Sequence, residues 1–202
     1  MYKRQLKDYA LKFDGAEIEN LQVTQAEIDE AFAGMDPYFL ETLREAAANI
    51  ESFHRQQVHK NFVVNDKPGI VLGQKYTPIE KAGVYVPGGT AAYPSTVLMD
   101  VIPAKVAGVS EIVMTTPAGK DGKINPVILA AAATAGVTRI FKTGGAQAVA
   151  ALAYGTQSIP AVDKIVGPGN IYVATAKRKV FGKVGIDMIA GPSEILVLAD
   201  GG

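Results

Sequence analysis

The sequence predicts an α/β fold with a mainly parallel, Rossmann-like sheet covered by helices on both faces. From Gly83 onward, short β-branched runs alternate with Gly or Pro and then with Ala-rich helical stretches. Successive strand centres lie about 25 to 30 residues apart, close to the roughly 30 residues that one strand and its crossover helix need. The strand runs are continuously apolar, which is typical of a parallel sheet that is buried on both sides.

Residues 1–82 are more polar and are predicted to form a helix-rich segment. Thr24-Gln-Ala-Glu27 fits a capping box, which predicts a short helix ending near Gly34. Asp36-Pro37 supplies an N-cap and a first-turn proline for a longer helix reaching about residue 56. Apolar residues follow at spacings of three and four and form one stripe on that helix, namely Leu40, Leu43, Ala47, Ile50 and Phe53. Residues 62–64 and 69–73 are predicted to be short strands.

The remaining chain is divided into predicted strand and helix units. The predicted strands are 84–86, 111–114, 139–141, 164–166 and 194–198, and the predicted helices are 95–107, 126–136, 146–154 and 170–181. Pro103 falls inside the first of these helices and is expected to kink or interrupt it, because proline removes a backbone donor.

Four Gly-rich turns follow strands of this predicted sheet, at 87–89, 144–147, 167–170 and 191–193. Open α/β sheets bind ligands outside the carboxyl ends of their strands. Gly lets a backbone approach a ligand closely, and a helix that starts after such a turn directs N–H groups toward an anion. Gln147 and Asn170 add an amide donor and acceptor at two helix starts.

Tight βα packing alone explains any single one of these turns, whereas four at corresponding positions favour a ligand site. No G-x-G-x-x-G motif and no phosphate-binding loop motif follows a strand, so the residues themselves do not name the ligand.

Composition excludes several classes of function. Twenty basic and twenty acidic residues leave no net charge, so nucleic acid and anionic membranes are not expected partners. Cysteine is absent, which excludes disulfides and thiol chemistry. Neither a signal peptide nor a membrane-spanning apolar run is found, and a soluble cytoplasmic protein is expected.

Other reactive side chains give weaker signals. His54 and His59 are the two histidines, and without a third ligand they are expected to be structural or surface residues. Lys177-Arg178-Lys179 is expected to be a solvated helix face. Three carboxylates lie near strand ends, but no spacing pairs them as acid and base: Asp163, Asp187 and Glu194. No catalytic and no metal-ligating residue is predicted in this chain.

An ordered set of motifs runs through residues 83–202. It consists of Gly83-Val-Tyr-Val-Pro-Gly-Gly89, Pro94-Ser-Thr-Val-Leu-Met99, Pro103-Ala-Lys-Val-Ala-Gly108, Gly144-Gly-Ala-Gln-Ala148, Ala150-Ala-Leu-Ala-Tyr-Gly-Thr156, Val162-Asp-Lys-Ile165, Gly167-Pro-Gly-Asn170, Ile186-Asp-Met188 and Ala190-Gly-Pro-Ser-Glu194. Lys12-Phe-Asp-Gly15 and Leu72-Gly-Gln74 extend the set toward the N-terminus. In this order the motifs resemble the histidinol dehydrogenase family, and the ordered set is far more specific than any one motif.

The resemblance implies an enzyme that oxidises L-histidinol to L-histidine through an aldehyde, the last step of histidine biosynthesis. It implies NAD and zinc as cofactors, a homodimer, and an incomplete Rossmann-like fold related to that of aldehyde dehydrogenases. Carried over by motif, Tyr85, Gln147 and Asn170 would contact NAD, and Ser193 would contact the substrate.

The resemblance also implies that this chain corresponds to about half of a family member. Residues 1–82 would belong to the larger family domain, 83–193 would form the NAD-binding domain, and 194–202 would be a truncated return strand. The family's zinc ligands and its catalytic His and Glu have no counterpart here, so the chain alone is expected to be inactive. Apolar surface near residues 1–82 should be exposed. The alternatives are a stand-alone nucleotide-binding or regulatory module without catalysis and an unrelated α/β structural protein.

Overall fold

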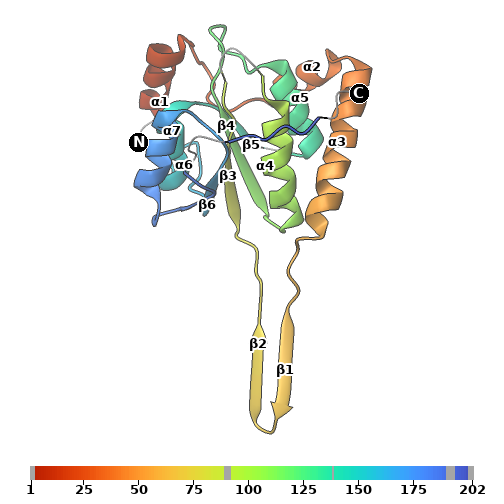
Figure 1. Ribbon diagram of the computed structural model, residues 1–202. Helices are drawn as coiled ribbons and strands as arrows, with labels where there is room; N and C mark the ends of the chain where they lie inside the picture. Colours follow the sequence, from red (N-terminus) through yellow and green to blue (C-terminus); the bar gives the residue numbers. More distant parts are fainter. Residues whose placement is uncertain (1–2, 89–91, 138, 190–193, 200–202) are drawn as a thin grey trace.

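A five-stranded parallel sheet forms the centre of the molecule, as predicted (Figure 1). The computed structural model describes residues 3–88, 92–137, 139–189 and 194–199. The strands are β3 (Lys81–Tyr85), β4 (Glu111–Thr116), β5 (Arg139–Lys142), β6 (Lys164–Val166) and β7 (Gly185–Ile186).

The spatial order of the strands is β5-β4-β3-β6-β7. The chain therefore starts in the middle of the sheet at β3, runs to one edge through β4 and β5, and returns to β6 on the other side of β3. This reversal makes the crevice between β3 and β6 the topological switch point, where ligands of such sheets bind.

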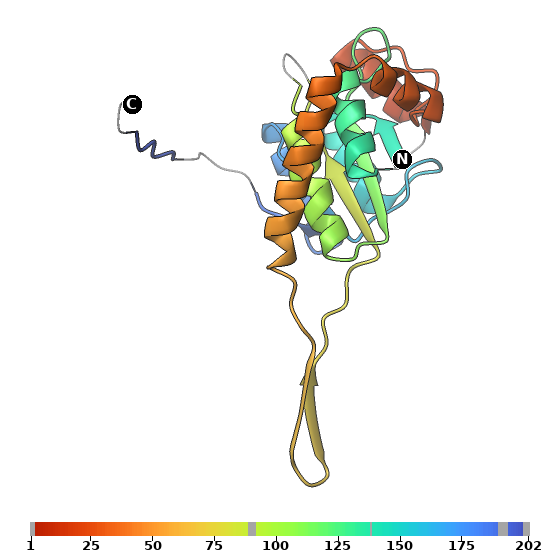
Figure 2. The same ribbon diagram turned by 90° about the vertical axis from the view of Figure 1, so that its right-hand side faces the viewer.

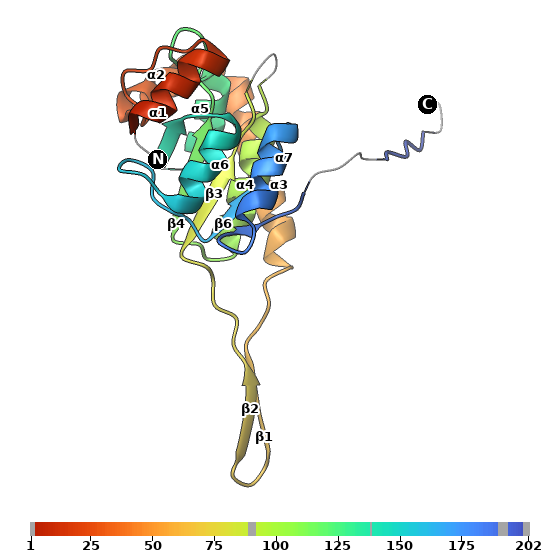
Figure 3. The ribbon, with the colours of Figure 1, turned by 90° about the vertical axis from the view of Figure 1, so that its left-hand side faces the viewer.

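Helices cover both faces of the sheet (Figure 1). On one face lie α4 (Pro94–Val106) and α5 (Pro126–Ala135), and on the other α6 (Gly145–Tyr154) and α7 (Ile171–Val180). Outside α4 and α5, α2 (Gln25–Ala33) and α3 (Pro37–Arg55) add a further layer. Figure 3 shows α1 (Lys3–Tyr9) near α6, and a π-helical turn, η1 (Ala10–Asp14), follows α1.

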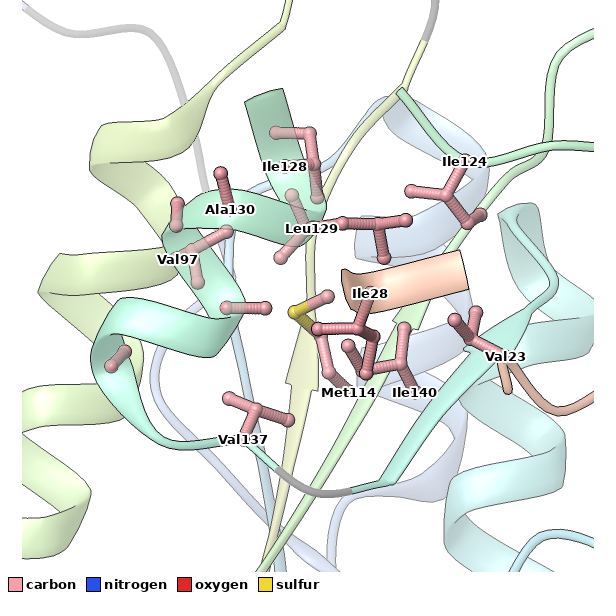
Figure 4. Packing of buried hydrophobic residues seen from close by; sticks show 14 of the residues in the cluster. Val23, Ile28, Val97, Met114, Ile124, Ile128, Leu129, Ala130, Val137 and Ile140 are labelled. Atoms are coloured by element: carbon pink, nitrogen blue, oxygen red, sulfur yellow. The ribbon is translucent and has the colours of Figure 1, made fainter. Parts of the chain in front are cut away.

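Each face of the sheet has its own apolar core. Beneath α4 and α5, Met114 of β4 and Ile140 of β5 pack with side chains of those helices and with Ile28 of α2 (Figure 4). Phe141 points to the opposite side and packs in the cluster beneath α6 and α7 with Leu152. Because β3, β4 and β5 are buried on both faces, their sequences are apolar without alternation.

Local capping signals set the helix ends where the sequence predicts them. Thr24 accepts from the Glu27 amide and Glu27 bonds back to the Thr24 amide, which completes the capping box of α2. Asn125 caps α5, and Gly136 ends α5 with a φ of 81°. Glu27 also pairs with the buried Lys142 at the end of β5 and so ties α2 to the sheet.

A β-hairpin projects from the body of the molecule (Figures 1 and 2). It consists of β1 (Phe62–Lys67) and β2 (Ile70–Gln74), paired antiparallel with Phe62 opposite Gln74. All residues of both strands are exposed. Phe53, the last residue of the predicted α3 stripe, is also exposed, whereas Leu40 and Leu43 are buried. The expectation of exposed apolar surface in the N-terminal part is confirmed.

Three local predictions differ from the structure. Residues 194–198 are not a strand, and Ile195 to Leu198 are exposed, because no described strand lies beside them to supply backbone hydrogen bonds. Figures 2 and 3 show this segment away from the sheet. β7 is a strand that the sequence did not indicate. Pro103 was expected to kink or interrupt α4, and the interruption does not occur, because the helix continues for three more residues to Val106. None of the described helices is long and apolar enough to cross a membrane.

Candidate functional site

The turns after β3, β4 and β5 meet at the carboxyl edge of the sheet. Pro117, which follows β4, lies close to both Gly88 and Gly144. A Cβ atom at Gly88 would lie 2.4 Å from Pro117 Cγ, and one at Gly144 would lie 2.7 Å from Pro117 Cβ. The glycines therefore allow the two Gly-rich turns to close against Pro117, which is the tight βα packing expected from the sequence as the alternative to a ligand site.

The ends of β3 and β6 also meet, backbone against backbone, at the switch point. Gly167 has a φ of 117°, and a Cβ atom there would lie 2.1 Å from the carbonyl oxygen of Tyr85. No side chain fits in this position. The turn after β6 is consequently fixed directly against the end of β3, at the place where the fold predicts a ligand.

Tyr85 supports this edge from below. Only 4% of the residue is exposed, and its ring belongs to the core beneath α6 and α7. Its hydroxyl accepts a hydrogen bond of 3.0 Å from the Gly145 amide at the start of α6. Burial raises the pKa of the Tyr85 hydroxyl, which therefore stays protonated at neutral pH. The structure thus places Tyr85 under the first turn of α6.

Gln147 covers the same turn from the outside. It is half-buried, and its side-chain amide folds back over Gly145, where a Cβ atom would lie 2.9 Å from Gln147 Oε1. Gly145 has a φ of 67°, which favours glycine. Tyr85 and Gln147, which are 62 positions apart in the sequence, therefore converge on one glycine.

Asn170 is the N-cap of α7. Its Oδ1 atom accepts from the amides of Tyr172 and Val173, both at 3.1 Å, and the residue is exposed. The cap uses the oxygen, so the Nδ2 group is the part of this side chain that is left to donate to a ligand. Ser193, the predicted substrate contact, lies outside the described residues.

A buried charge cluster lies behind Gly167. Lys177 is only 3% exposed, its Nζ atom donates to Gly167 O at 3.0 Å, and it forms an ion pair with Asp187. Asp187 Oδ2 in turn accepts from the Gly167 amide at 2.9 Å. The prediction that Lys177 belongs to a solvated face was wrong, while Arg178 and Lys179 are exposed.

A sequence signal for this burial exists in the spacing along α7. Val173, Lys177 and Val180 are its buried residues, and they follow at steps of four and three. Lys177 therefore occupies the apolar stripe of the helix, a position at which a lysine needs a partner.

Asp100 of α4 lies near the same cluster, because its carboxyl interacts electrostatically with both Asp187 and Lys177. Helices α4 and α7 lie on opposite faces of the sheet (Figure 1). Its Oδ2 atom is buried and has no hydrogen-bond partner among the described residues. Burial and the negative charge of Asp187 raise the pKa of Asp100 to about 7, against the lowering effect of Lys177. Neutral pH is thus close to the midpoint of its titration.

A groove of about 1000 Å³ opens at the same edge, on the side of β4 and α5. Pro87, Gly88 and Pro117 line it together with Asp14 of η1. Asp14 Oδ2 is buried without a hydrogen-bond partner among the described residues, and burial raises the pKa of this carboxyl. None of Tyr85, Gln147 and Asn170 lines this groove, so it is distinct from the switch point.

The two histidines contact residues outside this edge of the sheet. His54 Nδ1 lies 2.6 Å from Gln57 Oε1 at the end of α3, and His59 stacks on Tyr76 with ring centroids 4.6 Å apart. Within the part of the chain that the structure describes, no group of three or more His, Asp or Glu side chains is arranged to hold a metal ion.

Comparisons with known proteins agree over the whole described region. The family model of histidinol dehydrogenase matches residues 3–202. Histidinol dehydrogenases from Listeria innocua and Geobacillus kaustophilus are 62% and 60% identical over 195 residues, covering 96% of this chain and 45% and 46% of the relatives. The crystal structure of histidinol dehydrogenase from Elizabethkingia anophelis superposes with a TM-score of 0.91 at 41% identity, covering 95% of this chain and 44% of that one. The chain spans about half the length of the relatives it matches.

Proposed function

The chain belongs to the histidinol dehydrogenase family, and we propose that it supplies the NAD-binding part of an enzyme that oxidises L-histidinol to L-histidine through L-histidinal. The observation that carries this proposal is the switch point between β3 and β6, which is bordered by Gly-rich turns. Gly167 packs the turn after β6 directly on the end of β3, and this turn therefore lies where open α/β sheets bind dinucleotides.

Each predicted residue has a role that follows from its position. Asn170 donates from Nδ2 while its Oδ1 atom keeps α7 capped. Gln147 offers its amide over the first turn of α6, where backbone N–H groups favour a phosphate. Tyr85 holds that turn through Gly145 and acts from beneath the nucleotide. When bound, NAD accepts the hydride that leaves the carbinol carbon of the substrate.

Zinc is assigned no ligand in the described residues, because they bring no three suitable side chains together. Ser193 stays a proposed substrate contact. A homodimer in the cytoplasm completes the proposal, on the strength of the family alone.

Calorimetric titration with NAD tests the nucleotide site. Asn170→Asp keeps the capping oxygen, loses the Nδ2 donor and adds a charge that repels phosphate. Asn170→Asp and Gln147→Ala are each expected to weaken NAD binding by about 3- to 10-fold, the effect of one hydrogen bond. Gln157→Ala is a matched control, because Gln157 is an exposed glutamine outside the predicted site. Equal affinities for all three variants and the parent would contradict the site.

Turnover tests the second part of the proposal, that these 202 residues do not oxidise histidinol by themselves. The purified chain with L-histidinol, NAD and zinc is expected to form NADH no faster than a blank. A clear rate would show that a carboxylate or histidine of this chain performs the proton transfers. A stand-alone binding module, the alternative function, also predicts no turnover, and it differs in predicting a stable chain with micromolar affinity for NAD.

A further inference from the structure

We propose that Lys177 and Asp187 are positioning residues that hold the Gly167–Asn170 turn in the shape that binds the nucleotide. This inference rests on the proposed function. Both side chains act on a single residue: Lys177 donates to Gly167 O at 3.0 Å, and Asp187 accepts from the Gly167 amide at 2.9 Å. The ion pair between them closes the arrangement into one unit.

The geometry of Gly167 explains why its backbone needs Lys177 and Asp187 as hydrogen-bond partners. Its φ of 117° lies in a region that only glycine adopts readily, and glycine has the largest backbone freedom to lose. Its backbone groups also face away from regular strand pairing, since β6 ends at Val166. Without partners, these groups would be buried and unpaired next to the Tyr85 carbonyl.

Stability alone is a poor explanation for the buried Lys177–Asp187 ion pair. A buried ion pair contributes little net stability, and a pair of apolar side chains is often at least as stable. An apolar pair would pack α7 against the sheet but would leave both polar groups of Gly167 unpaired. The charged side chains of Lys177 and Asp187 therefore serve as hydrogen-bond partners for the C=O and N–H groups of Gly167, three residues before Asn170.

Asp100 completes the cluster from α4. Its carboxyl interacts electrostatically with both Asp187 and Lys177. Its buried Oδ2 atom has no hydrogen-bond partner among the described residues. Loss of Lys177 would remove the cation that balances the negative charges of Asp100 and Asp187, and their repulsion is expected to push Asp187 away from Gly167.

The test combines two measurements on the 202-residue chain, with NADH as the probe. Amide hydrogen exchange at Gly167 and Asn170, followed by NMR, reports the order of the turn, and NADH fluorescence reports nucleotide affinity. Lys177→Met and Asp187→Asn are each expected to speed exchange at Gly167 and to weaken NADH binding by about tenfold or more, as misplaced binding groups do. Asp187→Asn keeps the side-chain shape and serves if Lys177→Met fails to fold.

Two controls separate positioning from general destabilisation. Lys179→Met removes an exposed lysine from the same helix, and Ile128→Ala truncates the core beneath α5 on the opposite face of the sheet. Both are expected to leave NADH affinity and Gly167 exchange at parent values. Unchanged exchange in Lys177→Met, or faster exchange with unchanged NADH affinity, would overturn the inference. Failure of the parent chain to bind NADH would contradict the proposed function instead. The exchange data alone would then decide whether Lys177 and Asp187 order the turn at Gly167.

Discussion

At the scale of single residues, Gly167 is the position where the fold tolerates least change. Gly167→Ala would place a Cβ atom 2.1 Å from the Tyr85 carbonyl oxygen at a positive φ. We expect it to lower the free energy of unfolding by roughly 3 kcal/mol or more, through backbone strain and overpacking together. Urea unfolding measures this.

Gly69 is the matched control for that substitution. It also has a positive φ, 77°, but a Cβ atom there would meet nothing within 4 Å. Gly69→Ala should therefore cost only the left-handed backbone strain, about 1 to 2 kcal/mol. If the two variants lost equal stability, the close contact between the ends of β3 and β6 would be refuted.

The raised pKa of Asp100 predicts that the stability of the fold depends on pH. Its pKa is about 7 in the folded protein against an ordinary value of 3.8, so the folded state binds the proton more tightly. The stability that this proton contributes is fully present below about pH 4 and is lost as pH rises through about 7, at up to about 1.4 kcal/mol per pKa unit. Asp100→Asn, which resembles the neutral acid, should flatten this loss.

The check is the free energy of unfolding of parent and variant from pH 4 to pH 8. We expect Asp100→Asn to gain about 1 to 4 kcal/mol on the parent over that range, the upper value being the full shift without solvent screening. Parallel curves for the two proteins would show that Asp100 is not buried beside Asp187.

At the scale of elements, the β1–β2 hairpin is separable from the core. All its strand residues are exposed, and its ends are adjacent because Phe62 pairs with Gln74. Replacing residues 63–73 by a short Gly-Ser linker should therefore change the melting temperature by only about 2 °C or less, since surface changes rarely exceed about 0.5 kcal/mol. A large drop, measured by circular dichroism, would mean that the hairpin packs on the body.

Elements whose signals are local were predictable from the sequence. Thr24, Asn125 and Asn170 cap helices at the predicted helix starts, because a cap needs only backbone amides two or three positions away. Residues 194–198 have the strand composition but no strand partner among the described residues, and pairing is not a local property. The same limit hid β7, which has two residues and exists through its pairing with β6.

Site residues divide along the same line. Gln147 and Asn170 could be proposed as ligand contacts from the sequence because each follows a Gly-rich turn. The burial of Lys177 was missed because its partners, Gly167 and Asp187, are each ten residues away, in opposite directions along the sequence. The burial of Tyr85 likewise depends on the packing of α6 over its ring, and no short motif encodes a contact between residues so far apart in the sequence.

At the scale of the whole molecule, the strand order determines where we expect a nucleotide to bind. The carboxyl edge offers two places, the switch point between β3 and β6 and the groove on the side of β4 and α5. The first has the close backbone contacts between β3 and β6 and lies beside Asn170. The second is a groove of about 1000 Å³ that is lined by Asp14, whose buried Oδ2 atom has no hydrogen-bond partner among the described residues. The family membership favours NAD, and the topology favours the switch point.

A crystal structure of the chain grown with NAD would test this central claim most directly. We predict nucleotide density across the turns at Gly88 and Gly167, with Asn170 and Gln147 within hydrogen-bonding distance of it. Density confined to the groove beside Asp14, or a chain that binds no NAD at saturating concentration, would contradict the assignment of the switch point as the nucleotide site.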